Sequence, residues 1–169
     1  MIHANLGRLA GMRAPSPVTS TLHPDQVLVV FDGTCGLCSD IAGWTMRLDW
    51  RRKLAWLPAQ TPGLLDAVGL TPRDADTAAW AIMPDGEPRR GAAAIAAATD
   101  ALLPGGPPLC ATLQRLPGLR GASDAAYAWV ARNRGRWPGH PVCDRRPPPP
   151  LDDTVRWEIE RRHERFCLG

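Results

Sequence analysis

The spacing of hydrophobic and polar positions predicts short strands and helices that follow one another along the chain. Residues 27–31, VLVVF, form a continuous apolar run, which is typical of a strand buried on both faces. This run passes directly into the polar, glycine-containing segment 32–38. Beyond it, a helix is predicted by side chains at the spacing of one helical face: Ile41, Trp44, Thr45 and Leu48. The first predicted unit is therefore a strand, a tight turn and a helix.

Further apolar runs and turn residues continue this alternation. The predicted elements are strands over 54–57, 77–83 and 88–90, and helices over 62–68, 92–103 and 109–116. Thr71 would cap another short helix with Pro72 in its first turn, and the turn 84–87 would close a hairpin. Ser123 would cap a longer helix that continues to Arg134. This order implies an α/β fold, a mixed sheet flanked by helices with a hairpin at one edge.

The two ends of the chain differ in pattern from the middle. Residues 1–24 are interpreted as a flexible leader, and residues 25–144 as the folded domain. The proline-rich segment 145–150 is typical of a stiff linker. A last helix is predicted within 151–169 by the stripe Val155, Ile159, Arg162 and Phe166. So short a helix is marginal alone in water, so it docks on the domain, binds a partner or frays.

Composition narrows the class of protein. With 169 residues, 44% hydrophobic and 22% charged, the chain suits one compact domain with tails and excludes wholesale disorder. The N-terminus lacks the apolar core of a secretory signal, and the run 91–103 is shorter than the roughly 20 residues of a membrane span. We therefore expect a cytoplasmic monomer that binds no membrane. Lys53 is the only lysine among 20 basic residues, a bias typical of a GC-rich bacterial genome.

Positive charge gathers toward the C-terminal third. Residues 115–150 hold seven Arg against two Asp, although the formal net charge of the whole chain is only +3. An acidic partner and a solvated basic surface both fit this pattern. The aromatic-interleaved basic motifs of nucleic-acid-binding folds are not found there, so we expect no nucleic-acid partner.

The five cysteines carry the candidate chemistry. In a reducing compartment they point to catalytic, metal-binding or buried thiols rather than to structural bridges. Cys35 and Cys38 stand between the first predicted strand and its helix, and a helix N-terminus lowers a thiol pKa from about 8.5 into a range of roughly 3.5 to 7.5. Cys38 follows after almost one helical turn and can close a disulfide. We therefore predict Cys35 as the nucleophile and Cys38 as the resolving cysteine of thiol–disulfide exchange, with no bound cofactor.

The residues around this pair have supporting roles. Gly33 and Gly36 are predicted to allow a sharp strand-to-helix turn, in which Thr34 lies between them. Asp32 has two interpretations. Its carboxylate relays a proton to or from Cys38, or it caps the turn by accepting hydrogen bonds from N–H groups.

Residues 31–38, FDGTCGLC, resemble the signature of the DCC thiol-disulfide oxidoreductases, a family named for its Asp and two Cys. Residues 127–134, followed by Cys143, are similar to that family's C-terminal signature, and residues 85–93 to its middle segment. The resemblance implies a thioredoxin-like fold and a disulfide oxidoreductase activity. In a reducing compartment we expect a protein-disulfide reductase, acting on a disulfide-containing protein or a small disulfide with an unknown reductant.

One feature departs from the wider thioredoxin pattern. Thioredoxins carry a cis-proline just before their third main strand, where it faces the cysteines. Here the nearest preceding proline, Pro72, stands well before the strand predicted from residue 77. We therefore expect either that another residue shapes the substrate groove, or that exchange with protein disulfides is poorer than in thioredoxin.

Two other classes of function stay open. A zinc site needs thiolate and imidazole ligands, which are offered by Cys35, Cys38, His140 and Cys143. Alternatively, the domain is a non-enzymatic adaptor whose C-terminal helix binds a partner. Cys110 and Cys167 are interpreted as bystanders. Cys143 is interpreted as a structural or accessory thiol, with a part in relaying the disulfide left open.

Overall fold

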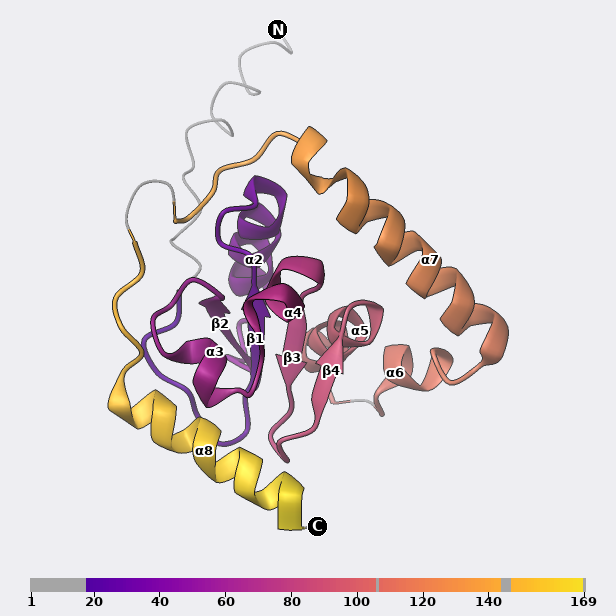
Figure 1. Ribbon diagram of the computed structural model, residues 1–169. Coiled ribbons are helices and arrows are strands. Elements are labelled where there is room, and N and C mark those ends of the chain that lie inside the picture. Colours follow the sequence, from indigo (N-terminus) through magenta and orange to yellow (C-terminus); the bar gives the residue numbers. More distant parts are fainter. Residues whose placement is uncertain (1–17, 106, 144–146, 169) are drawn as a thin grey trace, which may run out of the picture.

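The structure is a computed structural model that describes residues 18–105, 107–143 and 147–168. Its centre is a four-stranded sheet of β1 (Val27–Phe31), β2 (Leu54–Pro58), β3 (Trp80–Ile82) and β4 (Pro88–Arg90), in the order β2-β1-β3-β4 (Figure 1). β1 pairs parallel with β2 and antiparallel with β3, and β4 pairs antiparallel with β3. The predicted fold class, a thioredoxin-like mixed sheet flanked by helices, is confirmed.

Helices connect and cover these strands. Their bounds are α2 Gly36–Leu48, α3 Leu64–Ala67, α4 Pro72–Thr77, α5 Ala92–Leu102, α6 Leu109–Leu113, α7 Pro117–Asn133, the short 3-10 helix η1 Arg134–Arg136, and α8 Asp153–Leu168. Figure 1 shows α8 beside α3 on one side of the molecule and α7 on the opposite side. Among the described helices, none is long and apolar enough to cross a membrane.

The central strand β1 is buried on both faces, as its continuous apolar run predicts. Alternate side chains of β1 point to opposite sides. Leu28 and Val30 join one core cluster, whose helical members come from α3, α4 and α8. Val27, Val29 and Phe31 join the other cluster, which α2 and α5 close with small alanine side chains. The small alanine side chains let α5 pack closely against β1. The C-terminal end of this buried strand leads into the segment 32–38.

The C-terminal helix docks on the domain, which resolves the three alternatives left open for it. Val155 and Ile159 are buried in the core cluster that contains Leu28. Arg162 is fully buried, forms an ion pair with Glu158 at 3.0 Å and donates to the backbone carbonyl of Gln26. The fourth member of the predicted stripe, Phe166, is half exposed. The helix therefore completes one layer of the fold.

Several predicted boundaries differ from the structure, as in α3 and α6, which are shorter than predicted, and local chemistry explains two further differences. The strand predicted over 77–83 begins only at Trp80, because α4 runs to Thr77. Thr71 and Asp74 form a reciprocal capping box, which stabilises that helix. Ser123 does not cap α7 but lies inside it, and its hydroxyl donates to the carbonyl of Arg120. The helix begins instead at Pro117, since proline in the first turn loses only an N–H that would have no helical partner.

The predicted leader and linker fall partly outside the described residues. Of the leader, 1–24, only residues 18–24 are described, and Thr19 there exchanges hydrogen bonds with the backbone of Trp56. Of the linker, 145–150, residues 147–150 are described, without helix or strand. Just before α8 begins, Leu151 donates its N–H to the carbonyl of Pro62.

Candidate active site

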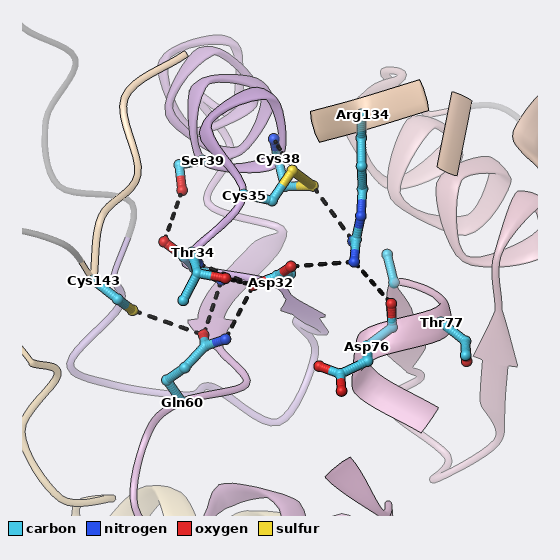
Figure 2. Close-up of polar contacts among 12 residues, drawn as sticks. Asp32, Thr34, Cys35, Cys38, Ser39, Gln60, Asp76, Thr77, Arg134 and Cys143 are labelled. Atoms are coloured by element: carbon cyan, nitrogen blue, oxygen red, sulfur yellow. Dashed lines mark hydrogen bonds and ion pairs between the residues drawn. A yellow bond between two sulfur atoms is a disulfide. The ribbon is translucent and has the colours of Figure 1, made fainter. Parts of the chain in front are cut away.

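Cys35 and Cys38 lie at the C-terminal end of β1, where the chain turns into α2, and they form a disulfide with their Cα atoms 5.2 Å apart (Figure 2). Cys35 is the N-cap residue of α2, and its Sγ accepts a hydrogen bond from the N–H of Cys38 at 3.2 Å. Cys35 is only 9% exposed, whereas Cys38 is half-buried. The helix N-terminus thus directs a backbone donor at the first sulfur, as the sequence predicts.

Asp32 organises the turn that precedes the disulfide. Its Oδ1 accepts hydrogen bonds from the N–H and the hydroxyl of Thr34, at 2.9 and 2.7 Å, and from Gln60 Nε2 at 3.0 Å. Burial opposes ionisation of this carboxyl, but these hydrogen bonds and the charge of Arg134 outweigh it and keep its pKa below the ordinary value. These contacts favour the turn-forming interpretation of Asp32.

Gln60 was missed by sequence reasoning. It follows β2, and its Oε1 accepts the N–H of Gly33 at 2.9 Å, while its amide donates to Asp32. The parallel strands β1 and β2 end at the same edge of the sheet, which brings the two segments together. The signal available in the sequence was a polar residue just after a second buried strand, which alone does not identify a partner.

The predicted reason for Gly33 and Gly36 is wrong. Neither has the positive φ of a left-handed turn, but both lie where a side chain would collide with neighbouring segments. A Cβ on Gly33 would lie 2.5 Å from the Sγ of Cys143, and one on Gly36 would lie 2.6 Å from the backbone of Gly139. Close packing of the loop 137–143 against the turn therefore requires glycine at both positions.

Arg134 reaches the disulfide from η1, at the end of α7. Its Nη1 lies 3.9 Å from the Sγ of Cys38, and its Nη2 lies 3.2 Å from Asp32 Oδ2. The same Nη2 donates to the carbonyl of Asp76 at 2.8 Å, in the last turn of α4. Figure 2 shows the guanidinium between these three groups. The sequence placed Arg134 only at the end of a predicted helix and did not identify it as part of the site.

The segment before β3 contains no proline, and α7 holds it in place. The hydroxyl of Tyr127 accepts the N–H of Ala79 at 2.7 Å. Two helical turns later, Arg134 binds the carbonyl of Asp76 in the same segment. The described residues contain no cis peptide bond. The residues similar to the C-terminal signature therefore attach α7 to the segment that faces the disulfide.

The predicted zinc ligands do not come together. The exposed side chain of His140 lies 3.3 Å from Asp40, and the Sγ of Cys143 lies 3.7 Å from Gln60 Oε1. In Figure 2, Cys143 lies across the Asp32 turn from the disulfide. Across the described parts of the chain, no group of three or more His, Cys, Asp or Glu side chains is placed to hold a metal ion. The zinc alternative therefore lacks an assembled site.

The remaining cysteines lie in other elements. Cys110 is in α6, where burial and Asp100 raise the pKa of its thiol. Cys167 is exposed in the last turn of α8, near His163. Neither takes part in the contacts around the disulfide, which agrees with their interpretation as bystanders.

Comparison with known proteins adds one finding to this geometry. The model of a family described as DCC1-like thiol-disulfide oxidoreductase matches residues 29–140. The matched range contains the cysteine pair, Gln60 and Arg134 and ends before Cys143. Comparisons with curated proteins and with solved structures give no match.

Proposed function

The chain belongs to the DCC1-like thiol-disulfide oxidoreductase family, and on that premise we propose that it reduces disulfides through Cys35 and Cys38. The observation that carries this proposal is the position of Cys35 as the N-cap residue of α2, where it accepts the N–H of Cys38. A thiolate formed there gains a backbone hydrogen bond and the positive end of the helix dipole. Cys35 is therefore the nucleophile and Cys38 the resolving cysteine.

The exchange takes place in two balanced steps. The Cys35 thiolate attacks one sulfur of the substrate disulfide, and the other sulfur leaves as a thiolate that takes up a proton. Cys38 then loses its proton and attacks the Cys35 sulfur of the mixed disulfide, which releases the second substrate thiol. The substrate gains two electrons and the protein is left with a Cys35–Cys38 disulfide. A dithiol, or two monothiols, must return those electrons for the next cycle.

Stabilisation of the thiolate, rather than exposure, supports the assignment of the nucleophile. In the disulfide form Cys35 is the less exposed of the two cysteines. Its sulfur nevertheless receives the backbone donor, whereas the sulfur of Cys38 faces the side chain of Arg134. The two thiols therefore have different electrostatic partners, as a division into attacking and resolving roles requires.

The proposal names the substrate and the reductant only by chemical class. The substrate is a disulfide-containing protein or a small disulfide, and the reductant is a thiol of the same compartment. We place the protein in the cytoplasm, because a reducing compartment favours the reductase direction. We also take the protein to act as a monomer. Neither nucleic acid nor a membrane is needed for this activity, and the exchange itself requires no bound cofactor.

Trapping of the mixed disulfide tests the proposal. Reduced Cys38→Ser protein, mixed with oxidised glutathione or with insulin, is expected to accumulate an adduct at Cys35, because its resolving thiol is gone. Peptide mass analysis locates the adduct. Cys35→Ser is expected to form no adduct at Cys38, and Cys110→Ser, which alters only a thiol of α6, is expected to turn over like the wild type.

Two results would count against the proposal. If Cys38→Ser accumulates no adduct at Cys35, the exchange chemistry is wrong. If the adduct forms instead at Cys38 in the Cys35→Ser variant, the pair is active but the two roles are reversed.

A further inference from the structure

The guanidinium of Arg134 is the one charged group, among the described residues, for which a contact with a sulfur of the cysteine pair is observed. We propose that Arg134 is a positioning residue which stabilises the reduced form of the pair through Cys38 and so makes the Cys35–Cys38 disulfide a stronger oxidant. This inference rests on the function proposed above and assigns a role to a side chain outside the C-x-x-C motif.

Three contacts fix the position of this guanidinium. It donates to the carbonyl of Asp76 at 2.8 Å, pairs with Asp32 at 3.2 Å and lies 3.9 Å from the Sγ of Cys38. Its side chain is 25% exposed, and that of Asp32 only 11%. A planar guanidinium can serve three partners at fixed directions, which a lysine ammonium on a flexible stem reproduces poorly. The charge is therefore held beside the sulfur.

The contact favours the reduced state for an electrostatic reason. A disulfide carries no charge, whereas its reduction produces thiols that ionise. A cation beside Cys38 lowers the free energy of that thiolate and leaves the disulfide almost unaffected. Stabilisation of the reduced form raises the reduction potential of the couple.

The same contact assists the second step of exchange. Cys38 must lose its proton before it attacks the Cys35 sulfur of the mixed disulfide. Arg134 increases the fraction of Cys38 that is ionised at neutral pH, so more protein is ready for this attack. The electron pair of the new bond comes from Cys38, and the substrate sulfur leaves with the pair of the broken bond. Arg134 neither gives nor takes a proton.

Negative groups near the site act in the opposite direction. Asp32 partly neutralises Arg134, while the carboxylate of Asp40 faces His140. Asp76 uses its backbone carbonyl toward Arg134, and in Figure 2 its carboxylate points away from the disulfide. Removing the charge of Asp32 is therefore expected to shift the redox equilibrium in the direction opposite to removing the charge of Arg134.

A purely structural role for Arg134 makes a different prediction. Through Asp76, the side chain also holds the segment before β3. If that were its whole role, replacing it would lower stability and leave the redox equilibrium unchanged. The two roles are separated by measuring both the thermal midpoint and the equilibrium constant for oxidation of the protein dithiol by oxidised glutathione.

The experiment compares four variants of the full chain with the wild type at pH 7. Arg134→Gln is expected to raise the equilibrium constant for oxidation about tenfold, which corresponds to a potential lower by about 30 mV. Arg134→Lys is expected to recover part of this change, and Asp32→Asn to lower the constant. Arg136→Gln is the matched control, because Arg136 is exposed on the same turn and pairs with Asn133. It is expected to match the wild type.

The outcomes separate this inference from the proposed function. If the wild type shows no reversible couple, the proposed function fails. Suppose that the wild type shows a reversible couple. If Arg134→Gln then has the same equilibrium constant for oxidation as the wild type, or changes that constant no more than Arg136→Gln does, the proposed role of Arg134 is wrong. If Arg134→Gln does not fold, Asp32→Asn decides, since an unchanged or raised constant in that variant contradicts the electrostatic argument.

Discussion

Around the disulfide, single residues link segments that are far apart in the chain. Asp32 contacts Thr34 within its own turn, Gln60 after β2, and Arg134 after α7. A single carboxylate therefore connects three parts of the fold beside the cysteine pair. Its contacts are made in the ionised form, which is the reason that its pKa lies below the ordinary value despite burial.

This lowered pKa predicts how stability depends on pH. A carboxyl whose folded-state pKa is depressed stabilises the protein above its unfolded-state pKa, about 3.9, and the contribution is lost as the pH falls through the folded-state value. Asp32→Asn is therefore expected to lower the free energy of unfolding by about 1–2 kcal/mol at pH 7. The gap between variant and wild type is expected to narrow below pH 4, as measured by urea unfolding. If the variant and the wild type differ in free energy of unfolding by the same amount at pH 7 and below pH 4, the charge of Asp32 has no part in stability.

The local sequence predicted the contiguous part of the site and missed its distant members. Cys35 and Cys38 stand at a strand–helix junction, which is a local pattern and therefore readable. Gln60 and Arg134 are brought to the same place by the register of β1 with β2 and by the course of α7, and neither is encoded near the motif. Gly33 illustrates the same limit, because its neighbour Cys143 belongs to a remote loop.

Among the elements, α8 contains a buried carboxylate that forms ion pairs within its own helix. Glu158 is almost completely buried and forms ion pairs with Arg161, Arg162 and Arg165 on its own helix. Arg162 also donates hydrogen bonds to the carbonyls of Gln26 and His23, which precede β1, and so links α8 to the rest of the domain. The docking of α8 thus depends on a charge that must remain compensated.

Removal of that charge is expected to destabilise the fold. Glu158→Gln leaves Arg162 buried without its carboxylate, and losing one partner of a buried ion pair costs about 3 kcal/mol or more. The loss is measured by urea unfolding at pH 7. Glu160→Gln is the matched control, because Glu160 is exposed on the same helix. Equal stability of the two variants would contradict this role of the pair.

Sequence patterns predicted which strands and helices form better than they predicted the residues at which these elements begin and end. The continuous apolar run of β1 and the alanine-rich α5 are confirmed almost to the residue. The start of α4 at Thr71 and Pro72 was predicted, but its extension to Thr77 shortens the strand that follows, and α7 begins at Pro117 rather than after Ser123. The buried stripe of α8 was visible in the sequence, but the surface it covers depends on tertiary packing.

For the molecule as a whole, the order of strands in the sheet determines where the cysteine pair lies. β1 is central, buried on both faces, and ends at the cysteine pair, while β2 ends beside it with Gln60. One face is covered by α8 and the other by α2 and α5. α7 has no fully buried residue, and the chain that leaves it reaches the site through η1, which holds Arg134, and through the loop 137–143. A buried sheet therefore lies under the disulfide, and Arg134 of η1 supplies a cation beside it.

Equilibration of the protein in mixtures of reduced and oxidised glutathione, followed by thiol counting in denaturant, tests the redox function most directly. The wild type is expected to fall reversibly from five thiols to three in one two-electron transition, because Cys35 and Cys38 pair and the other three cysteines do not. The Cys35→Ser/Cys38→Ser double variant is expected to keep three thiols throughout. A wild-type thiol count that does not change, or a loss of thiols that persists in the double variant, would contradict a redox function for this pair.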